Sequence, residues 1–146
     1  MKQTSKKQYW ILNITIPILV GFSIYLLWTS DTYVSSMVRA LLRHFGLPEI
    51  PLLRLSGPAA RFARNHLCDM CWSYALVFSI ALIQGFTGKD VICTVWICSG
   101  FSAAMEIAQY LHIVSGTFDI LDIVLEIIAC IFAGMMIYLF DWRKKT

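Results

Sequence analysis

Two long apolar runs near the carboxyl end decide the fold: VICTVWICSGFSAAMEIAQYLHIV, Val91 to Val114, and FDILDIVLEIIACIFAGMMIYLF, Phe118 to Phe140. Only Ser115-Gly116-Thr117 separates them, and this tripeptide is a turn signal. Each run is long enough for a helix that crosses the hydrocarbon core of a bilayer, which takes about 20 apolar residues. The pair therefore predicts a hairpin of two membrane-spanning helices.

Two further runs extend this pattern toward the amino end. They are YWILNITIPILVGFSIYLLW, Tyr9 to Trp28, and CWSYALVFSIALIQGF, Cys71 to Phe86, which we extend back through Asp69. The first run is about twice the length of a signal-peptide core, so we expect it to be retained. The sequence predicts a single all-α domain over 1–146, an integral membrane bundle with spans at about 9–28, 69–86, 91–114 and 118–140.

The composition excludes other classes of protein. Hydrophobic residues make up 58% of the chain and charged residues 14%, with a mean hydropathy of +0.68. A soluble domain has roughly 25% charged residues, and a disordered chain is far less apolar. The net charge of +3 does not indicate nucleic-acid binding, because the cations lie at the termini and in one loop. Five cysteines cannot form a complete disulfide framework, and we expect them to be packing residues.

The extracytoplasmic loop, 29–66, is expected to contain two helices. Apolar residues from Val34 to Phe45 recur at helical spacing, with Arg39 and Arg43 on another face. This pattern predicts an amphipathic helix in the membrane interface between the first two spans. A second helix is expected after Ser56-Gly57-Pro58, carrying Arg61 and Arg64 toward the second span.

The distribution of Lys and Arg predicts the orientation in the cell membrane. Placing both termini in the cytoplasm puts seven cations inside and five outside. Short loops rich in Lys and Arg stay on the cytoplasmic side. We therefore expect a multi-pass protein with cytoplasmic termini.

Polar side chains enter three of the spans at one level, near the outer leaflet. Helical spacings of three and four residues place them on one face of each span. Ionisable groups in spans are costly and often functional. The candidate binding cluster comprises Glu106 and Gln109 on the third span, Asp119, Asp122 and Glu126 on the fourth, and His66 and Asp69 on the second, whose face continues to Trp72 or Ser73.

A purely structural role is the alternative for each of these groups. Asp69 and Asp119 stand where carboxylates cap helices, and Gln109 could form hydrogen bonds between helices. Glu106 and Asp122 face each other across a short hairpin and, if both stay charged, need a cation, an Arg or a metal between them. Otherwise at least one of them is protonated. Arg61 or Arg64 could supply that partner.

The stretch EIAQYLHIVSGTFDILDIVLE, 106–126, resembles the carboxyl-terminal signature of the VanZ-like membrane proteins. The signature has Glu-x-x-Gln on one span, a turn with Gly, and Asp-x-x-Asp opening the next. Upstream, NHLCDMCWSY, 65–74, is similar to the entry of the preceding span in some members. The residues that match are Glu106, Gln109, Gly116, Asp119 and Asp122, with Asn65, Asp69, Trp72 and Tyr74 upstream.

This resemblance covers roughly a third of the chain and implies a role in the cell envelope. The family takes its name from a member linked to resistance to the glycopeptide antibiotic teicoplanin. Many relatives carry Arg in the turn and Asn where this chain has Glu126, so this chain lacks an expected partner for its carboxylates.

Three functions remain open. We favour a non-enzymatic envelope protein without a cofactor that binds an amphiphile or lipid-linked precursor through the acidic cluster and loop arginines. The second is a metal-assisted, lipid-modifying hydrolase using Glu106, Asp119, Asp122 and His112 or His66. The third is a proton- or ion-coupled transporter with Glu106 and Asp122 as its relay. Small residues at Ala129 and Ala133 leave a homodimer open.

Overall fold

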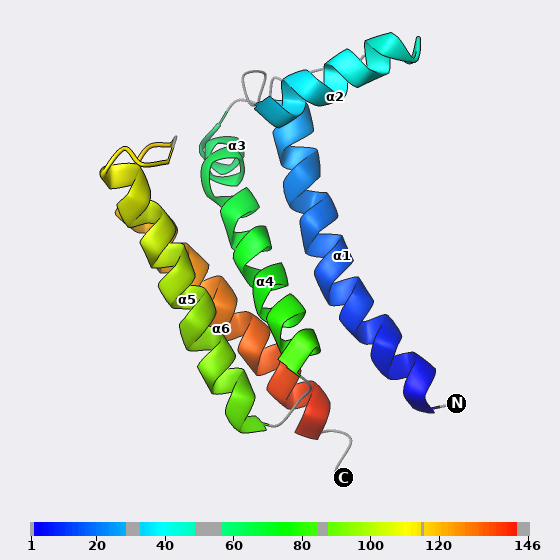
Figure 1. Ribbon diagram of the computed structural model, residues 1–146, viewed down its shortest axis with the longest axis vertical. Helices are drawn as coiled ribbons and strands as arrows, with labels where there is room; N and C mark the ends of the chain where they lie inside the picture. The colour runs from blue at the N-terminus through cyan, green and yellow to red at the C-terminus, as the bar shows by residue number, and fades with distance from the viewer. Residues whose placement is uncertain (1, 29–32, 49–56, 85–87, 115, 143–146) are drawn as a thin grey trace.

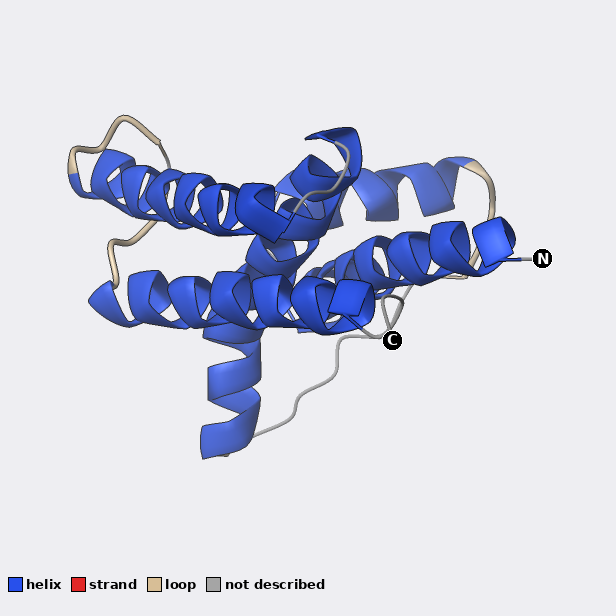
Figure 2. Cartoon of the chain, turned by 90° about the horizontal axis from the view of Figure 1, so that it is seen from below, coloured by secondary structure: helices blue, strands red, loops and turns tan. Residues whose placement is uncertain are grey.

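The computed structural model describes residues 2–28, 33–48, 57–84, 88–114 and 116–142, and these residues form helices joined by turns, with no strand among them (Figures 1 and 2). The all-α class is therefore confirmed. The elements are α1 (Lys2–Trp28), α2 (Tyr33–His44), α3 (Pro58–Phe62), the π-helical turn η1 (Ala63–Leu67), α4 (Cys68–Gln84), α5 (Gly88–Tyr110) and α6 (Ile120–Trp142).

Four helical segments are long and apolar enough to cross a membrane, as the hydropathy pattern predicts. At 1.5 Å per residue, a segment of 21 residues extends about 30 Å, the thickness of a hydrocarbon core. These candidate spans are Gln8–Trp28, Pro58–Gln84, Asp90–Tyr110 and Ile120–Phe140.

The boundaries of two spans differ from the expected positions. The second begins at Pro58 because α3, η1 and α4 follow one another without a break. Residues 85 and 86, at its expected end, lie outside the described residues, as do Ser56 and Ser115. The third helix ends at Tyr110, where His112 adopts a left-handed φ of 57°. The Ile113 amide then donates to the Ala108 carbonyl at 2.9 Å, which closes the helix end.

The core lies where α6 packs against both α4 and α5, and α1 packs against α4 on the other side (Figure 1). Val77 and Phe78 of α4 are fully buried there together with Cys98, Cys130 and Ala133. Small residues allow the close approach of α6 to α5. A Cβ built on Gly134 would lie 2.6 Å from a methyl carbon of Val95. Cys93 is exposed, unlike the packing role expected of it.

The α2 helix extends sideways from the end of α1, away from the bundle (Figure 1). It ends in a turn at Gly46, whose φ is 65°. The Leu47 amide donates to the Leu42 carbonyl at 2.9 Å, the bond that characterises a helix closed by glycine. Met37 and Leu41 on this helix are more than half exposed.

Candidate functional site

The polar side chains of three spans meet at one end of the bundle, where η1 and the start of α4 lie near the end of α5 and the start of α6. Figure 1 shows α3 and the turn between α5 and α6 at this same end. We call the group His66, Asp69, Glu106, Asp119, Asp122 and Glu126 the acidic chamber.

A direct contact between His66 and Asp122 joins the second span to the fourth. His66 Nδ1 lies 2.5 Å from Asp122 Oδ1, and the two side chains are only 11% and 13% exposed. His66 belongs to the π-helical turn η1, which widens the helix by one residue. This local widening determines the direction in which the His66 ring leaves the helix.

Asp119 links the third span to the fourth and also caps α6. Its Oδ1 accepts the Leu121 amide at 2.9 Å, which is the standard contact of a helix cap. Its own amide donates to Glu106 Oε2 at 3.1 Å. Glu106 is only 5% exposed, so α5 brings a buried carboxylate to the start of α6.

One turn deeper, Glu126 connects the chamber to the centre of the bundle. Glu126 is 8% exposed, and its Oε2 accepts the Ser73 hydroxyl at 3.0 Å. Ser73 Oγ also lies 3.1 Å from Ser102 Oγ, so α4, α5 and α6 share one buried polar layer. Asp69 is half-buried and interacts electrostatically with Glu126, Asp122, Glu106 and His66.

Gln109 and Gly116 support the turn. Gly116 has a φ of 153°, and a Cβ built there would lie 2.6 Å from Gln109 Cδ. The Gln109 side chain therefore packs on the turn backbone, and the positive φ at 116 is a conformation that favours glycine.

The remaining sequence-predicted residues point elsewhere. Trp72 is 45% exposed, so Ser73 is the member of this helix that continues the polar face inward. Asn65 accepts a 3.2 Å hydrogen bond from Arg64 Nε, and Arg64 and Arg61 are exposed. In the described part of the chain, His66 is the only basic side chain in ion-pair contact with the chamber carboxylates.

Sequence reasoning missed the His66–Asp122 pair and the role of Ser73 as donor to Glu126. The spacing of His66, Asp69 and Ser73 placed them on one face, but a regular helix does not predict the π-helical turn. The partner of each group depends on how the helices are rotated against one another.

Three side chains of the chamber have the arrangement of metal ligands. His66, Asp119 and Asp122 each offer one ligand atom, and these atoms all lie within 4.8 Å of one another. Imidazole and carboxylate together suit several divalent cations. His112, the other histidine considered for this role, is exposed on the turn and lies outside this group.

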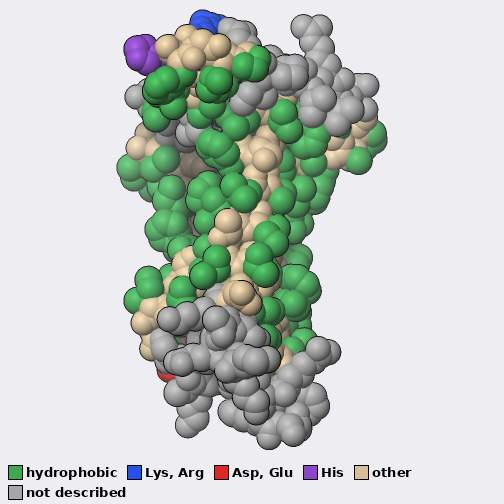
Figure 3. Space-filling model, turned by 90° about the vertical axis from the view of Figure 1, so that its right-hand side faces the viewer, with side chains coloured by type: hydrophobic (Ala, Val, Ile, Leu, Met, Phe, Trp, Pro, Cys, Tyr) green, Lys and Arg blue, Asp and Glu red, His purple; other side chains and the backbone are tan. Residues whose placement is uncertain are grey.

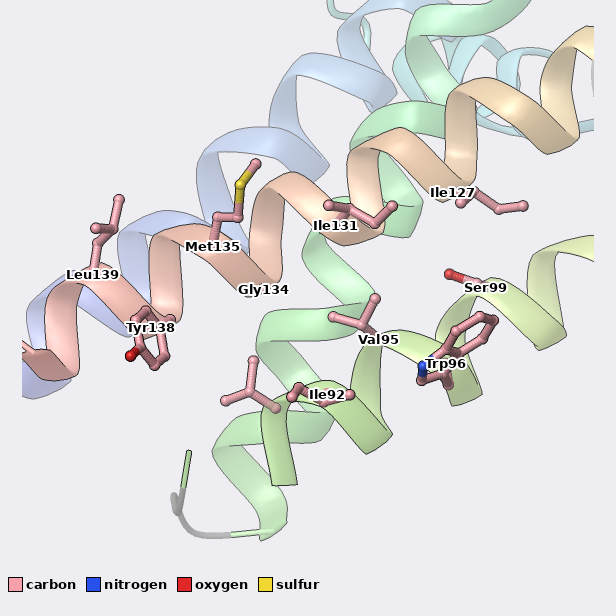
Figure 4. Close-up of a pocket in the computed structure, with 11 residues that line it drawn as sticks. Ile92, Val95, Trp96, Ser99, Ile127, Ile131, Gly134, Met135, Tyr138 and Leu139 are labelled. Atoms are coloured by element: carbon pink, nitrogen blue, oxygen red, sulfur yellow. The ribbon is translucent and has the colours of Figure 1, made fainter. Parts of the chain in front are cut away.

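Two apolar grooves open on the bundle surface below the chamber. One, of about 660 Å³, lies between α5 and α6, from Ser99 and Ile127 at one end to Tyr138 and Leu139 at the other (Figure 4). The second, of about 500 Å³, is lined by α1, α4 and α6 and includes Met70, which follows Asp69 directly. Both grooves are lined almost entirely by hydrocarbon.

Compared with known proteins, the chain matches no family model, no curated protein and no solved structure.

Proposed function

We propose that this chain is a multi-pass protein of the cell membrane that binds an amphiphile or lipid-linked precursor at the acidic chamber. The single observation that carries the proposal is the meeting of five carboxylates and one imidazole from three helices at one end of an apolar bundle. Ionisable groups at such a depth are costly and mark sites of function.

The surface supports residence in a bilayer. Ile83, Trp96 and Ile113 are 84%, 75% and 73% exposed, which would be unfavourable in water. On the face seen in Figure 3, hydrophobic side chains cover the middle of the molecule, and the visible His, Lys and Arg side chains gather at one end. We further propose that α2 lies in the outer interface and that both termini are cytoplasmic, as the Lys and Arg distribution favours.

The grooves suit the hydrophobic part of an amphiphile. The groove between α5 and α6 extends along α6 from Ile127, directly after Glu126, to Leu139. Twelve residues of helix correspond to about 18 Å, roughly the length of an acyl chain. The polar head group of the ligand would then bind the polar residues of the chamber, and its hydrocarbon chain would lie in the apolar groove.

We place this binding function in the cell envelope. Its support is the resemblance of 106–126 to the VanZ-like signature, in which the matching residues are three chamber carboxylates and two residues at the turn: Glu106, Asp119, Asp122, Gln109 and Gly116. A role in resistance to a glycopeptide antibiotic belongs to the same proposal. The chamber is acidic, so its carboxylates would repel an anionic head group that binds without a cation.

The test is native mass spectrometry of the protein purified in a mild detergent. We expect a co-purified amphiphile on the natural protein, and its loss from Glu106→Gln. The matched control is Asp90→Asn, which likewise removes one negative charge, from an acidic residue that is exposed at the opposite end of α5. Equal lipid occupancy in the natural protein and Glu106→Gln, with both proteins folded, would contradict the proposal.

A further inference from the structure

We infer that His66, Asp119 and Asp122 hold a divalent cation, and that this cation recognises a phosphate-bearing head group. The inference rests on the proposed binding of an amphiphile and names the class of its head group. It assigns a chemical role to the three ligand atoms that lie within 4.8 Å of one another.

The three ligands come from positions that hold them firmly. His66 is carried by η1 and contacts Asp122 on the first turn of α6. Asp119 is held by its bond to the Leu121 amide and by the bond from its own amide to Glu106. A cation that binds here would replace the proton between His66 Nδ1 and Asp122 Oδ1, or use the other nitrogen and oxygen of that pair. The three residues are already close together, which lowers the cost of ordering them.

The buried Glu106 side chain adds negative charge beside the three ligands. Glu106 is 5% exposed, and its carboxylate interacts electrostatically with those of Asp119, Asp122 and Glu126. Its Oε2 accepts the Asp119 amide, which is neutral and so leaves the charge of the carboxylate uncompensated. No Lys or Arg in the described ranges forms an ion pair with this group. Buried charges of one sign are expensive unless a cation or protons neutralise them.

The ligand types define the class of cation. One imidazole nitrogen with two carboxylate oxygens suits a cation between the hard and borderline classes, such as Mn²⁺. Three protein ligands leave coordination positions open for water or another oxygen donor. Asp119 is the most exposed of the three ligands, so a molecule from outside the bundle can reach the cation on that side.

Charge then selects the head group. The chamber carboxylates would repel a phosphate, and no Arg or Lys of the described part of the chain forms an ion pair with them. A bound cation with open coordination positions would make the local charge positive and would bind phosphate oxygens directly. An amine-bearing head group would compete with the cation for the same carboxylates.

The first experiment uses Mn²⁺ alone as the probe. The full chain in detergent is stripped with a chelator, and Mn²⁺ binding is followed by electron paramagnetic resonance. We expect one Mn²⁺ per chain and a loss of affinity of at least about tenfold in His66→Asn and Asp119→Asn. Asn keeps the helix cap at 119, so that variant removes the charge without removing the cap. The control is His112→Asn, which should bind as the natural protein does.

Two results would overturn the cation site. One is the absence of Mn²⁺ binding to the natural chain. The other is unchanged affinity in both His66→Asn and Asp119→Asn, with circular dichroism showing that each has folded. If His66→Asn fails to fold, Asp119→Asn decides the question alone.

The second experiment measures binding of dodecyl phosphate, dodecylamine and inorganic phosphate by calorimetry, with and without Mn²⁺. We expect Mn²⁺ to tighten binding of dodecyl phosphate at least about tenfold, and Asp119→Asn to abolish this gain. Tight binding of dodecyl phosphate without Mn²⁺ would overturn the inference and leave the proposed function standing. Mn²⁺ binding with no affinity for either amphiphile would overturn the proposed function instead. Equal affinity for inorganic phosphate would overturn the assignment to a lipid head group.

Discussion

Asp119 shows how one side chain at the chamber combines structure and chemistry. Its carboxylate caps α6 through the Leu121 amide, while its own amide holds Glu106. The expected role of Asp119 as a helix cap is therefore confirmed. This role leaves the residue free to act in the chamber as well. The cap uses only Oδ1, so the second oxygen can serve a ligand.

This arrangement predicts different outcomes for two substitutions at 119. Asp119→Ala should lower the free energy of unfolding by about 1 kcal/mol, because α6 loses its cap. Asp119→Asn should lower it much less, because Asn caps a helix about as well as Asp. Unfolding in mixed micelles measures both, and equal destabilisation by the two variants would contradict the role of the cap.

Ser73 determines whether Glu126 can be accommodated in the centre of the bundle. Its hydroxyl donates to Glu126 Oε2 at 3.0 Å, and removing it leaves a buried acceptor without its donor. Ser73→Ala should therefore cost about 1–3 kcal/mol of unfolding free energy. Ser79→Ala is the matched control, since Ser79 Oγ donates only to the Ala75 carbonyl of its own helix. An equal effect of the two variants would show that the contact to Glu126 does not stabilise the fold.

Small residues on one face of α6 allow it to pack closely against neighbouring helices of the same chain. Ala129, Cys130 and Ala133 are buried there, and Gly134 meets Val95 of α5. The small-residue face of α6, which suggested a possible homodimer contact, is thus buried against other helices of the same chain. A homodimer stays a prediction, and it would need another face of the bundle.

Close packing of α6 against α5 makes Gly134 sensitive to any added volume. Gly134→Ala should cost about 1–3 kcal/mol, because its Cβ would lie 2.6 Å from a Val95 methyl carbon. Gly100→Ala is the control, since a Cβ at Gly100 meets nothing within 4 Å. Val95→Ala should restore much of the loss in Gly134→Ala. Failure of this rescue would contradict the proposed contact.

On the scale of the whole molecule, the sidedness of the chamber decides which ligands can reach it. Both termini in the cytoplasm would place the turn between α5 and α6 outside. In a chain whose five cysteines are replaced by alanine, an impermeant maleimide should label Thr117→Cys in intact cells and not Asp90→Cys. Thr117 is chosen over Gly116 because a Cβ at Gly116 would meet Gln109. The reverse labelling pattern would place the chamber on the cytoplasmic side.

Hydropathy and spacing by themselves determined the four long helices, the polar faces of three of them and the common level of those faces. They could do so because helical periodicity assigns residues to faces, and apolar length sets the number of spans. The same periodicity could not choose between Trp72 and Ser73, and it allowed Arg61 and Arg64 as partners although both are exposed.

Only the tertiary structure decided which groups touch. The rotation of each helix about its axis depends on close packing of neighbours such as Gly134 and Val95, and no single segment contains that information. The π-helical turn before α4 then directs His66 to Asp122. Contacts between helices are set by the packing of all of them together, whereas the face of each helix is a property of its own sequence.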